Sequence, residues 1–339
     1  MVRAARTPVV TVLASVLLAM LAGCGGSDEQ PQPRAGQPET GPEPVAQPSL
    51  PAPTTDGVVA RIRTGSQPCA AIAADGAFWV TNYGDDTVVK IDPARNRVVA
   101  TYQTASQPCG IVFAAGSLWV GSVGGQVLQQ MDPDTGEVLA QIPAGGSIFD
   151  VQYGFDSVWL NNYQADEVIR VDPERAEIVH RQMVGQTIYG LAVTPEGVWA
   201  ASQVDAAIVR IDPATNEVVA RIVDPHPFPT TFAYTDGALW VTHTDGYTGR
   251  VDPATNTVVA VVRTSADRAP GDPEGLAGAA WFPDRTTGLI ARVDPASNLI
   301  TAQVSLGEGY SVAQAGFDDL WVLNFAADDV ARIRPSQIQ

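Results

Sequence analysis

Short apolar runs separated by polar turn residues alternate along most of the chain, and the alternation recurs about every 40 residues. In the clearest copy, residues 110–140, four runs of mainly β-branched or aliphatic residues lie at Ile111–Ala114, Ser117–Ser122, Gln126–Met131 and Glu137–Gln141. Gly, Asp and Pro separate them, and these residues form turns. Short runs bounded by such turns are typical of β-strands. Each repeat therefore predicts four antiparallel strands.

Two markers keep the same spacing through seven repeats. The first is tryptophan, whose seven copies in the chain stand 40 or 41 residues apart at Trp79, Trp119, Trp159, Trp199, Trp240, Trp281 and Trp321. The second is an Asp-Pro pair beginning at Asp92, Asp132, Asp172, Asp212, Asp252 and Asp294, with Arg334-Pro335 in the seventh position. A helical solenoid would show a 3.6-residue period and fewer turns. Four strands repeated radially predict an all-β, seven-bladed β-propeller.

The two ends of the repeated region fit together. The chain ends after the third run of repeat seven, Val330–Pro335, and a run of the fourth kind, Val58–Thr64, precedes repeat one. It resembles the fourth runs Val98–Thr104 and Val218–Ile222. We expect this amino-terminal strand to complete the last blade and so close the ring, which removes exposed sheet edges. The propeller is predicted to occupy residues 57–339.

The start of the chain has the features of an export signal. Arg3 and Arg6 precede an apolar run, Pro8–Leu21, which is too short to span a membrane. The run ends in Leu-Ala-Gly-Cys24, which resembles the lipobox of bacterial lipoproteins. That resemblance implies a signal peptide at residues 1–23 and a lipid on Cys24. The alternative is an ordinary secretory signal with an incidental cysteine.

Residues 24–56 follow as a proline-rich segment with few apolar residues. Such a composition predicts a disordered or extended tether. Anchor, tether and propeller together predict a protein of the cell envelope that lies outside the cytoplasm. Its contact with the membrane is expected through the lipid anchor only.

Acidic residues outnumber basic ones. The chain has 37 Asp and Glu against 20 Lys and Arg, a net charge of −17, and loss of Arg3 and Arg6 with the signal would leave −19. Binding to nucleic acid, or directly to anionic lipid, needs basic patches. The charge therefore argues against both kinds of partner, and we expect a monomer.

Two cysteines, Cys69 and Cys109, hold the same position in repeats one and two. Export permits a disulfide, which requires Cα atoms within about 4.4–6.8 Å. Inner strands of adjacent blades diverge, however, so we expect a separation larger than the spacing of about 4.8 Å between paired strands. The prediction is two half-buried thiols, with the disulfide as the alternative.

Two positions in each blade are expected to converge on one face around the axis, where variation between blades can carry function. One starts the first strand, at Cys69, Cys109, Phe149, Tyr189, Thr230, Glu274 and Tyr310. The other lies three residues after each tryptophan, at Asn82, Ser122, Asn162, Ser202, His243, Asp284 and Asn324. The tryptophans recur in every blade and are expected to pack between sheets.

The first sector of this face is aromatic. Phe149, Tyr189 and Tyr310, with their neighbours Tyr83, Tyr163 and Phe325, accompany the amides of Asn82, Asn162 and Asn324. Aromatic faces beside amide groups suit a peptide or a sugar. The sequence therefore predicts these residues as ligand-binding, with a simple plug of the axis as the alternative.

The second sector, in blades five and six, is polar and contains His226, His243, Asp245, Glu274 and Asp284. Such side chains can hold a divalent metal or perform acid–base chemistry. No fixed ligand spacing is present, and scattered loop polar residues are the alternative. Blade six is also irregular, with a long loop at Thr264–Pro273 and a shortened first hairpin.

Several blade sequences resemble known repeats. Phe78–Asn82, Leu239–His243 and Ile211–Ala220 are similar to YVTN-type envelope propellers and to the streptogramin (virginiamycin B) lyase family. The lyase resemblance implies magnesium-assisted opening of a cyclic depsipeptide lactone. In those lyases two histidines and a glutamate stand at the positions of Thr230, Glu274 and Asp284. Here His243 and Asp284 leave an imidazole and a carboxylate nearby.

The function predicted from these features is binding. We expect a lipid-anchored propeller whose face binds a peptide, a glycan or an envelope protein, without chemistry of its own and without a cofactor. The alternative is a lyase or hydrolase that uses Mg²⁺ with His243, Glu274 and Asp284, and a third possibility is a scaffold bound through its rim. A Gly-x-Ser-x-Gly nucleophile elbow and a Gly-x-x-x-x-Gly-Lys phosphate loop do not occur in the sequence.

Overall fold

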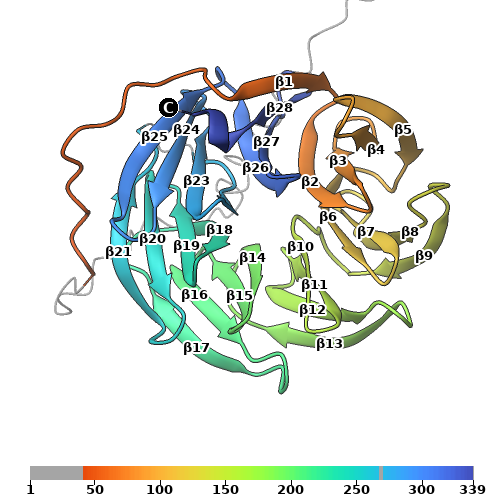
Figure 1. Ribbon diagram of the computed structural model, residues 1–339. Coiled ribbons are helices and arrows are strands. Elements are labelled where there is room, and N and C mark those ends of the chain that lie inside the picture. Colours follow the sequence, from red (N-terminus) through yellow and green to blue (C-terminus); the bar gives the residue numbers. More distant parts are fainter. Residues whose placement is uncertain (1–40, 267–269, 339) are drawn as a thin grey trace, which may run out of the picture. The chain divides into compact units, whose positions relative to one another are not determined.

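The computed structural model describes residues 41–266 and 270–338. These residues form seven four-stranded antiparallel sheets arranged around an axis (Figure 1), and a single 3-10 turn at Pro335–Gln337 follows the last strand. The predicted signal peptide, Cys24 and the first part of the tether lie outside the described residues. Within the described part, no helix is long and apolar enough to cross a membrane.

The strands follow one another in each sheet from the axis outward. Blades one to three comprise β2 (Pro68–Ala74), β3 (Ala77–Asn82), β4 (Thr87–Asp92) and β5 (Arg97–Gln103); β6 (Pro108–Ala114), β7 (Ser117–Ser122), β8 (Val127–Met131) and β9 (Val138–Pro143); and β10 (Val151–Gly154), β11 (Ser157–Asn162), β12 (Glu167–Asp172) and β13 (Glu177–Met183).

Blades four to six repeat the order with β14 (Ile188–Thr194), β15 (Gly197–Ser202), β16 (Ala207–Ile211) and β17 (Val218–Val223); β18 (Pro229–Thr235), β19 (Ala238–His243), β20 (Tyr247–Asp252) and β21 (Thr257–Arg263); and β22 (Glu274–Leu276), β23 (Ala279–Asp284), β24 (Leu289–Asp294) and β25 (Leu299–Ser305). Blade seven comprises β26 (Tyr310–Gly316), β27 (Asp319–Asn324), β28 (Asp329–Ile333) and β1 (Val58–Arg63). The predicted seven-bladed, all-β propeller is confirmed.

Ring closure by the amino-terminal strand is also confirmed. β1 pairs antiparallel with β28, from Val58 opposite Ile333 to Arg63 opposite Asp329. The last blade therefore combines strands from both ends of the propeller, which covers an edge that would otherwise present unpaired backbone groups.

Strand boundaries differ from the sequence prediction mainly at the first strand. In blade two this strand begins at Pro108 rather than Ile111. A register shift lies between Pro108 and Ile111, so Cys109 and Gly110 form a bulge that local apolar patterning does not reveal. Proline is compatible with the first position of a strand because its missing N–H is not needed there.

The segment before β1 is ordered in its second half. Residues 44–55, here called the strap, run along the outer strands of blades five and six (Figure 1). The Val45 N–H donates to Val261 O at 2.8 Å, and the Thr54 N–H donates to Gln303 O at 2.9 Å. This part of the predicted disordered or extended segment is extended and hydrogen-bonded to the ring. The outer edges of β21 and β25 carry backbone groups that are not paired within their own sheets. A few N–H groups of the proline-rich strap are enough to bond carbonyls along these edges.

The tryptophans are packed between sheets, as predicted, and all seven are fully or almost fully buried. A cation from the third strand lies over the indole in six of the described blades. The pairs are Lys90–Trp79, Arg170–Trp159, Arg210–Trp199, Arg250–Trp240, Arg292–Trp281 and Arg332–Trp321. Blade two carries Gln130 at this position, and its amide bonds Ser117.

Several of these cations also join neighbouring blades. Arg210 donates to Pro253 O at 3.0 Å and to Asn256 Oδ1 at 3.1 Å, in the Asp-Pro turn of the next blade. Arg332 makes the same contacts with Pro93 and Asn96 across the closure of the ring. The Asp-Pro turns therefore hold adjacent blades together as well as ending strands.

The free-thiol prediction for the two cysteines is wrong. Cys69 and Cys109 form a disulfide, with their Cα atoms 5.0 Å apart. Inner strands approach one another most closely near the axis, and both cysteines lie at register shifts in β2 and β6. A bulge redirects a side chain away from its own ladder, which lets these two side chains meet.

Candidate functional site

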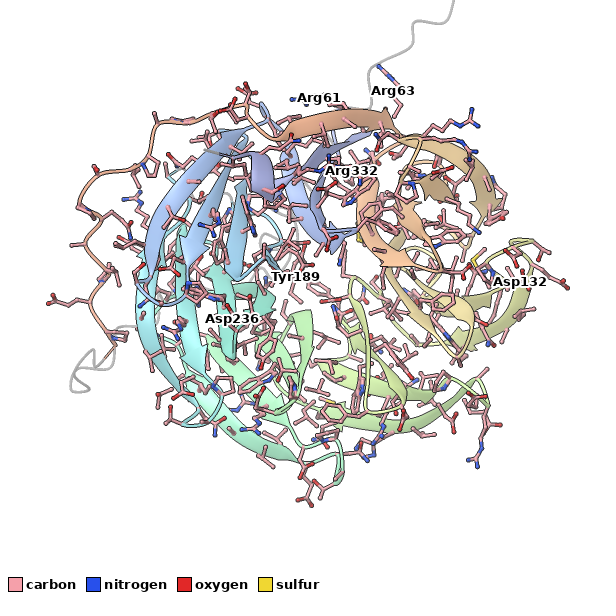
Figure 2. The ribbon with its side chains drawn as sticks, in the orientation of Figure 1. Arg61, Arg63, Asp132, Tyr189, Asp236 and Arg332 are labelled. Carbon is pink, nitrogen blue, oxygen red and sulfur yellow. A yellow bond between two sulfur atoms is a disulfide. The ribbon has the colours of Figure 1, made fainter. Side chains whose placement is uncertain are left out.

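The candidate site lies where the first strands begin, close to the axis. Phe149, Tyr163 and Tyr189 come from blades three and four and pack against one another, with ring centroids 5.2–6.4 Å apart. The Phe149 and Tyr189 rings are 29° from parallel, and the Tyr163 ring is steeply inclined to both. All three side chains are half-buried, and Figure 2 shows Tyr189 at the inner side of the ring of blades.

Two aspartates beside these rings were missed by the sequence reasoning. Asp150 follows Phe149, and its carboxylate accepts the Leu191 N–H at 2.7 Å and the Gln152 amide at 2.9 Å. Burial, with a smaller contribution from the charge of Asp272, raises the pKa of Asp150 to about 6. Burial likewise raises the pKa of Asp272. The charge of Arg285 and a hydrogen bond from Thr231 partly offset this rise.

Their position in the repeat could have revealed them. Asp150 and Asp272 each come one residue after the variable position at the start of a first strand. The pairing of β10 with β11 places Asp150 there, and the pairing of Pro270 with Asp284 places Asp272 there. In the other blades this position holds an uncharged residue: Ala70, Gly110, Gly190, Thr231 and Val312. A carboxylate at a position that is uncharged in every other blade is the signal that comparison of the repeats offered.

Electrostatic effects link residues of blades four and six. Burial raises the pKa of Tyr189, and the charge of Asp272 adds to the rise, whereas the charge of Arg285 opposes it. We call Phe149, Asp150, Tyr163, Tyr189 and Asp272 the axial cluster. Arg285 stands beside it, exposed to solvent, and donates to Pro270 O at 3.1 Å.

Tyr310 does not join the axial cluster. It is buried, its hydroxyl donates to Asp329 at 2.7 Å, and it accepts a hydrogen bond from Arg61 of β1. Burial, with the bond to Asp329, raises its pKa to about 12. Tyr310 pairs with Asn324, as Pro68 pairs with Asn82 in blade one, so it stands one residue before the predicted position. Tyr310 thereby holds β1 in the last blade, and its contact with a ligand stays a prediction.

Of the other predicted aromatics, Tyr83 and Phe325 form a separate pair, with centroids 6.0 Å apart.

The three predicted asparagines, Asn82, Asn162 and Asn324, are buried at the ends of second strands. Asn82 accepts the Gly65 N–H and donates to Thr87, and Asn324 donates to Glu308 O. Asn162 donates to Ala144 O and Glu167, while its buried Oδ1 has no partner. These amides connect turns within the chain, and their contact with a ligand stays a prediction.

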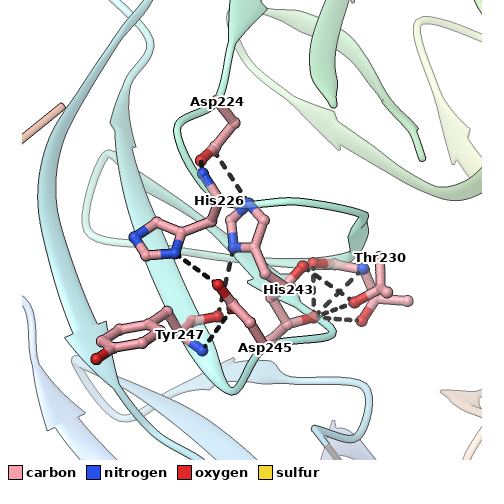
Figure 3. A network of polar contacts seen from close by, with 8 residues as sticks. Asp224, His226, Thr230, His243, Asp245 and Tyr247 are labelled. Atoms are coloured by element: carbon pink, nitrogen blue, oxygen red, sulfur yellow. Dashed lines mark hydrogen bonds and ion pairs between the residues drawn. The ribbon is translucent and has the colours of Figure 1, made fainter. Parts of the chain in front are cut away.

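The histidines of blade five form their own network (Figure 3). His243 Nε2 lies 3.1 Å from Asp224 Oδ2, and both side chains are fully buried. The two atoms do not align as a hydrogen bond. His243 Nδ1 lies 3.3 Å from Tyr247 O. A second pair, His226 Nδ1 with Asp245 Oδ2, is 2.8 Å apart.

The predicted meeting of His243 with Glu274 and Asp284 is not found. Asp284 accepts the N–H groups of Thr286 and Thr287 and so closes its own turn. Glu274 accepts the Gly275 N–H at 2.7 Å, and burial raises its pKa to about 7. Among the described residues no hydrogen bond or ion pair joins these carboxylates to His243. Nor do three or more His, Cys, Asp or Glu side chains gather there in a way that could hold a metal ion.

The register explains why Glu274 is displaced. It pairs with Trp281, as Ile72 pairs with Trp79 in blade one. Glu274 therefore stands three residues beyond the variable position, which Gly271 occupies in blade six. The long loop and shortened hairpin of this blade had concealed that shift.

Comparisons with known proteins identify the fold. No known family model and no curated protein sequence matches the chain. Similar solved structures include a streptogramin B lyase (TM-score 0.69, 14% identity, 82% of this chain and 95% of that one) and the virginiamycin B lyase from Staphylococcus aureus (0.71, 14%, 81% and 98%). Hydrazine synthase from Kuenenia stuttgartiensis is equally similar (0.70, 14%, 80% and 97%). The chain therefore shares a virginiamycin-lyase-like propeller fold with proteins of different activities.

Proposed function

We propose that this propeller binds a peptide, a glycan or an envelope protein through the axial cluster. The observation that carries the proposal is the convergence of three half-buried aromatic rings and two carboxylates from blades three, four and six. Ligand sites combine apolar and aromatic surface with a few polar groups that fix orientation. Titratable groups with displaced pKa values cluster at such sites.

Binding is favoured over catalysis by the state of the second sector. The streptogramin-lyase alternative would use Mg²⁺ with His243, Glu274 and Asp284, but the buried imidazole of His243 lies against Asp224 of the loop before β18. Shared fold does not imply shared activity, because function resides in the site. Magnesium-dependent opening of a cyclic depsipeptide lactone, lost in His243→Ala, would favour the alternative.

A panel of short peptides and oligosaccharides tests the proposal. We expect at least one to bind the full chain, with about tenfold or greater loss of affinity in Tyr189→Ala, because aromatic contacts contribute on the order of 1 kcal/mol or more. Titration by isothermal calorimetry measures the affinity. The matched control is Tyr153→Ala, in blade three but exposed to solvent. Equal affinity of the Tyr189→Ala variant for every ligand that binds would contradict the axial cluster as the site.

We further propose that a lipid on Cys24 attaches the protein to the membrane of the cell envelope. The lipobox-like ending of the apolar segment supports this. A rigid ring on a spacer would then present its ligand site outside the cytoplasm, without need of a spanning helix.

A further inference from the structure

We infer that the axial cluster recognises a cation, namely the ammonium or guanidinium group of a basic peptide. This inference rests on the proposed binding function and specifies the chemistry of its ligand. It follows from three features: the arrangement of the rings, carboxylates that form no ion pair with any described residue, and the charge of the whole chain.

The three half-buried rings lie in two nearly perpendicular orientations, and we refer to their surface as the corner. Phe149 and Tyr189 are nearly parallel at 5.7 Å, and Tyr163 is inclined by 70° and 77° to them. The face of an aromatic ring carries negative potential and attracts a cation placed within about 6 Å of its centroid. The apolar stem of a lysine or arginine can pack against the rings at the same time. A long basic side chain therefore fits this surface better than a compact ion.

The carboxylates beside the corner have neutral partners. Asp150 is bonded by a backbone N–H and by the amide of Gln152, and Asp272 is bonded by Thr231. Arg285 is the cation whose charge acts on Asp272, but it forms no ion pair among the described residues and donates to a backbone carbonyl. A buried charge is stabilised chiefly by pairing. An incoming cation would supply that pair.

The charge of the chain favours the same ligand. Its net charge of −17 attracts basic peptides over long range. A divalent metal is a poorer candidate, because the described residues contain no cluster of three potential metal-ligating side chains. An amino sugar carries the same ammonium group without a long apolar stem, and it serves as a competing outcome in the test.

Binding is then expected to depend on pH. The groups facing the corner are Asp150 beside β10, Tyr163 and Tyr189 from blades three and four, and Asp272 and Arg285 from blade six. A bound cation stabilises the ionised carboxylates, so binding releases protons and lowers their pKa values. Because the pKa of free Asp150 is about 6, affinity is expected to rise as pH increases from about 5 to about 7.5.

The experiment compares two peptides that differ in one charge. The full chain is titrated with the capped peptide Gly-Gly-Lys-Gly-Gly and with the same peptide carrying Nε-acetyl-lysine. We expect at least tenfold weaker binding of the acetylated peptide, and a comparable loss for the lysine peptide in Asp150→Asn and Asp272→Asn. The control is Asp156→Asn, an exposed acid in the β10–β11 turn of the same blade.

Each result separates the two proposals. Equal binding of both peptides, lost in Tyr189→Ala, would overturn the cationic ligand and leave the binding site intact. Tighter binding of a glucosamine hexamer than of the lysine peptide would replace the peptide by an amino sugar. No binding of the lysine peptide would overturn the inference. If Asp150→Asn fails to fold, as judged by its melting curve, the comparison of the two peptides on the unmodified chain still decides it.

Discussion

At the scale of residues, the third-strand arginine found in five of the seven blades performs several tasks. The Arg210 guanidinium lies 5.3 Å from the Trp199 ring centroid and donates to Glu196 O of its own blade. It also reaches Pro253 O and Asn256 of the next blade. Arginine suits this place because its planar group can stack on a ring while its N–H groups point to acceptors at the edge.

Replacement of Arg210 by glutamine imitates the natural residue of blade two, Gln130. We expect Arg210→Gln to lower the free energy of unfolding by about 1–3 kcal/mol, because the cation–π contact and the bonds between blades are lost. Urea denaturation followed by tryptophan fluorescence measures the change. Arg97→Gln on the exposed face of β5 is the control. Equal stability of both variants would show that the bonds between blades contribute little.

At the scale of elements, the segment made up of the strap and β1 contacts blades five, six and seven. The strap lies along β21 and β25, where the Gln47 side chain also bonds Asn298 O and the Ile300 N–H. Val45 packs against the apolar core between blades five and six. β1 then supplies the outer strand of blade seven, and Arg61 binds Tyr310 inside that blade.

Three chains that begin at residues 41, 56 and 66 separate these contributions. The chain from residue 41 keeps every described contact and serves as the reference. We expect the chain from 56 to lose about 1–3 kcal/mol with the strap's hydrogen bonds, and the chain from 66 to lose several kcal/mol more with β1, enough to unfold a marginal domain. Thermal melting checks the order. A chain from 56 as stable as the reference would show that the strap is not a stabilising element.

At the scale of the whole molecule, the ordered strap limits the spacer between a lipid on Cys24 and the ring. Residues 25–43 remain for it, and their fully extended length is on the order of 65 Å. The ligand site would therefore stay close to the membrane.

The anchor has a direct test. We expect Cys24→Ala to abolish incorporation of radioactive palmitate and to leave the precursor uncleaved by lipoprotein signal peptidase, because the thiol is the proposed site of lipid attachment. A Cys69→Ala variant controls for the other thiols, since Cys69 is held in the disulfide. Labelling of Cys24→Ala at the normal level would disprove the lipoprotein proposal.

The architecture could be read from local features. Tryptophan spacing, Asp-Pro turns and short apolar runs specify strands and turns within each 40-residue unit, and seven copies require a ring. The fourth-type run at Val58–Thr64 predicted closure, because a missing strand at one end matched an extra strand at the other. These features depend on residues close together in the sequence.

The site and the strap were decided by tertiary structure. Asp150 and Asp272 are 122 positions apart in the sequence, and Val45 reaches Val261 across more than 200 residues. One-residue bulges at the first strands set which side chains meet, bringing Cys69 to Cys109 and directing Tyr310 toward β1. His243 likewise lies against Asp224, from the loop before β18, rather than against Asp284. Shifting a strand by one residue exchanges its two faces, and only packing between blades fixes that shift.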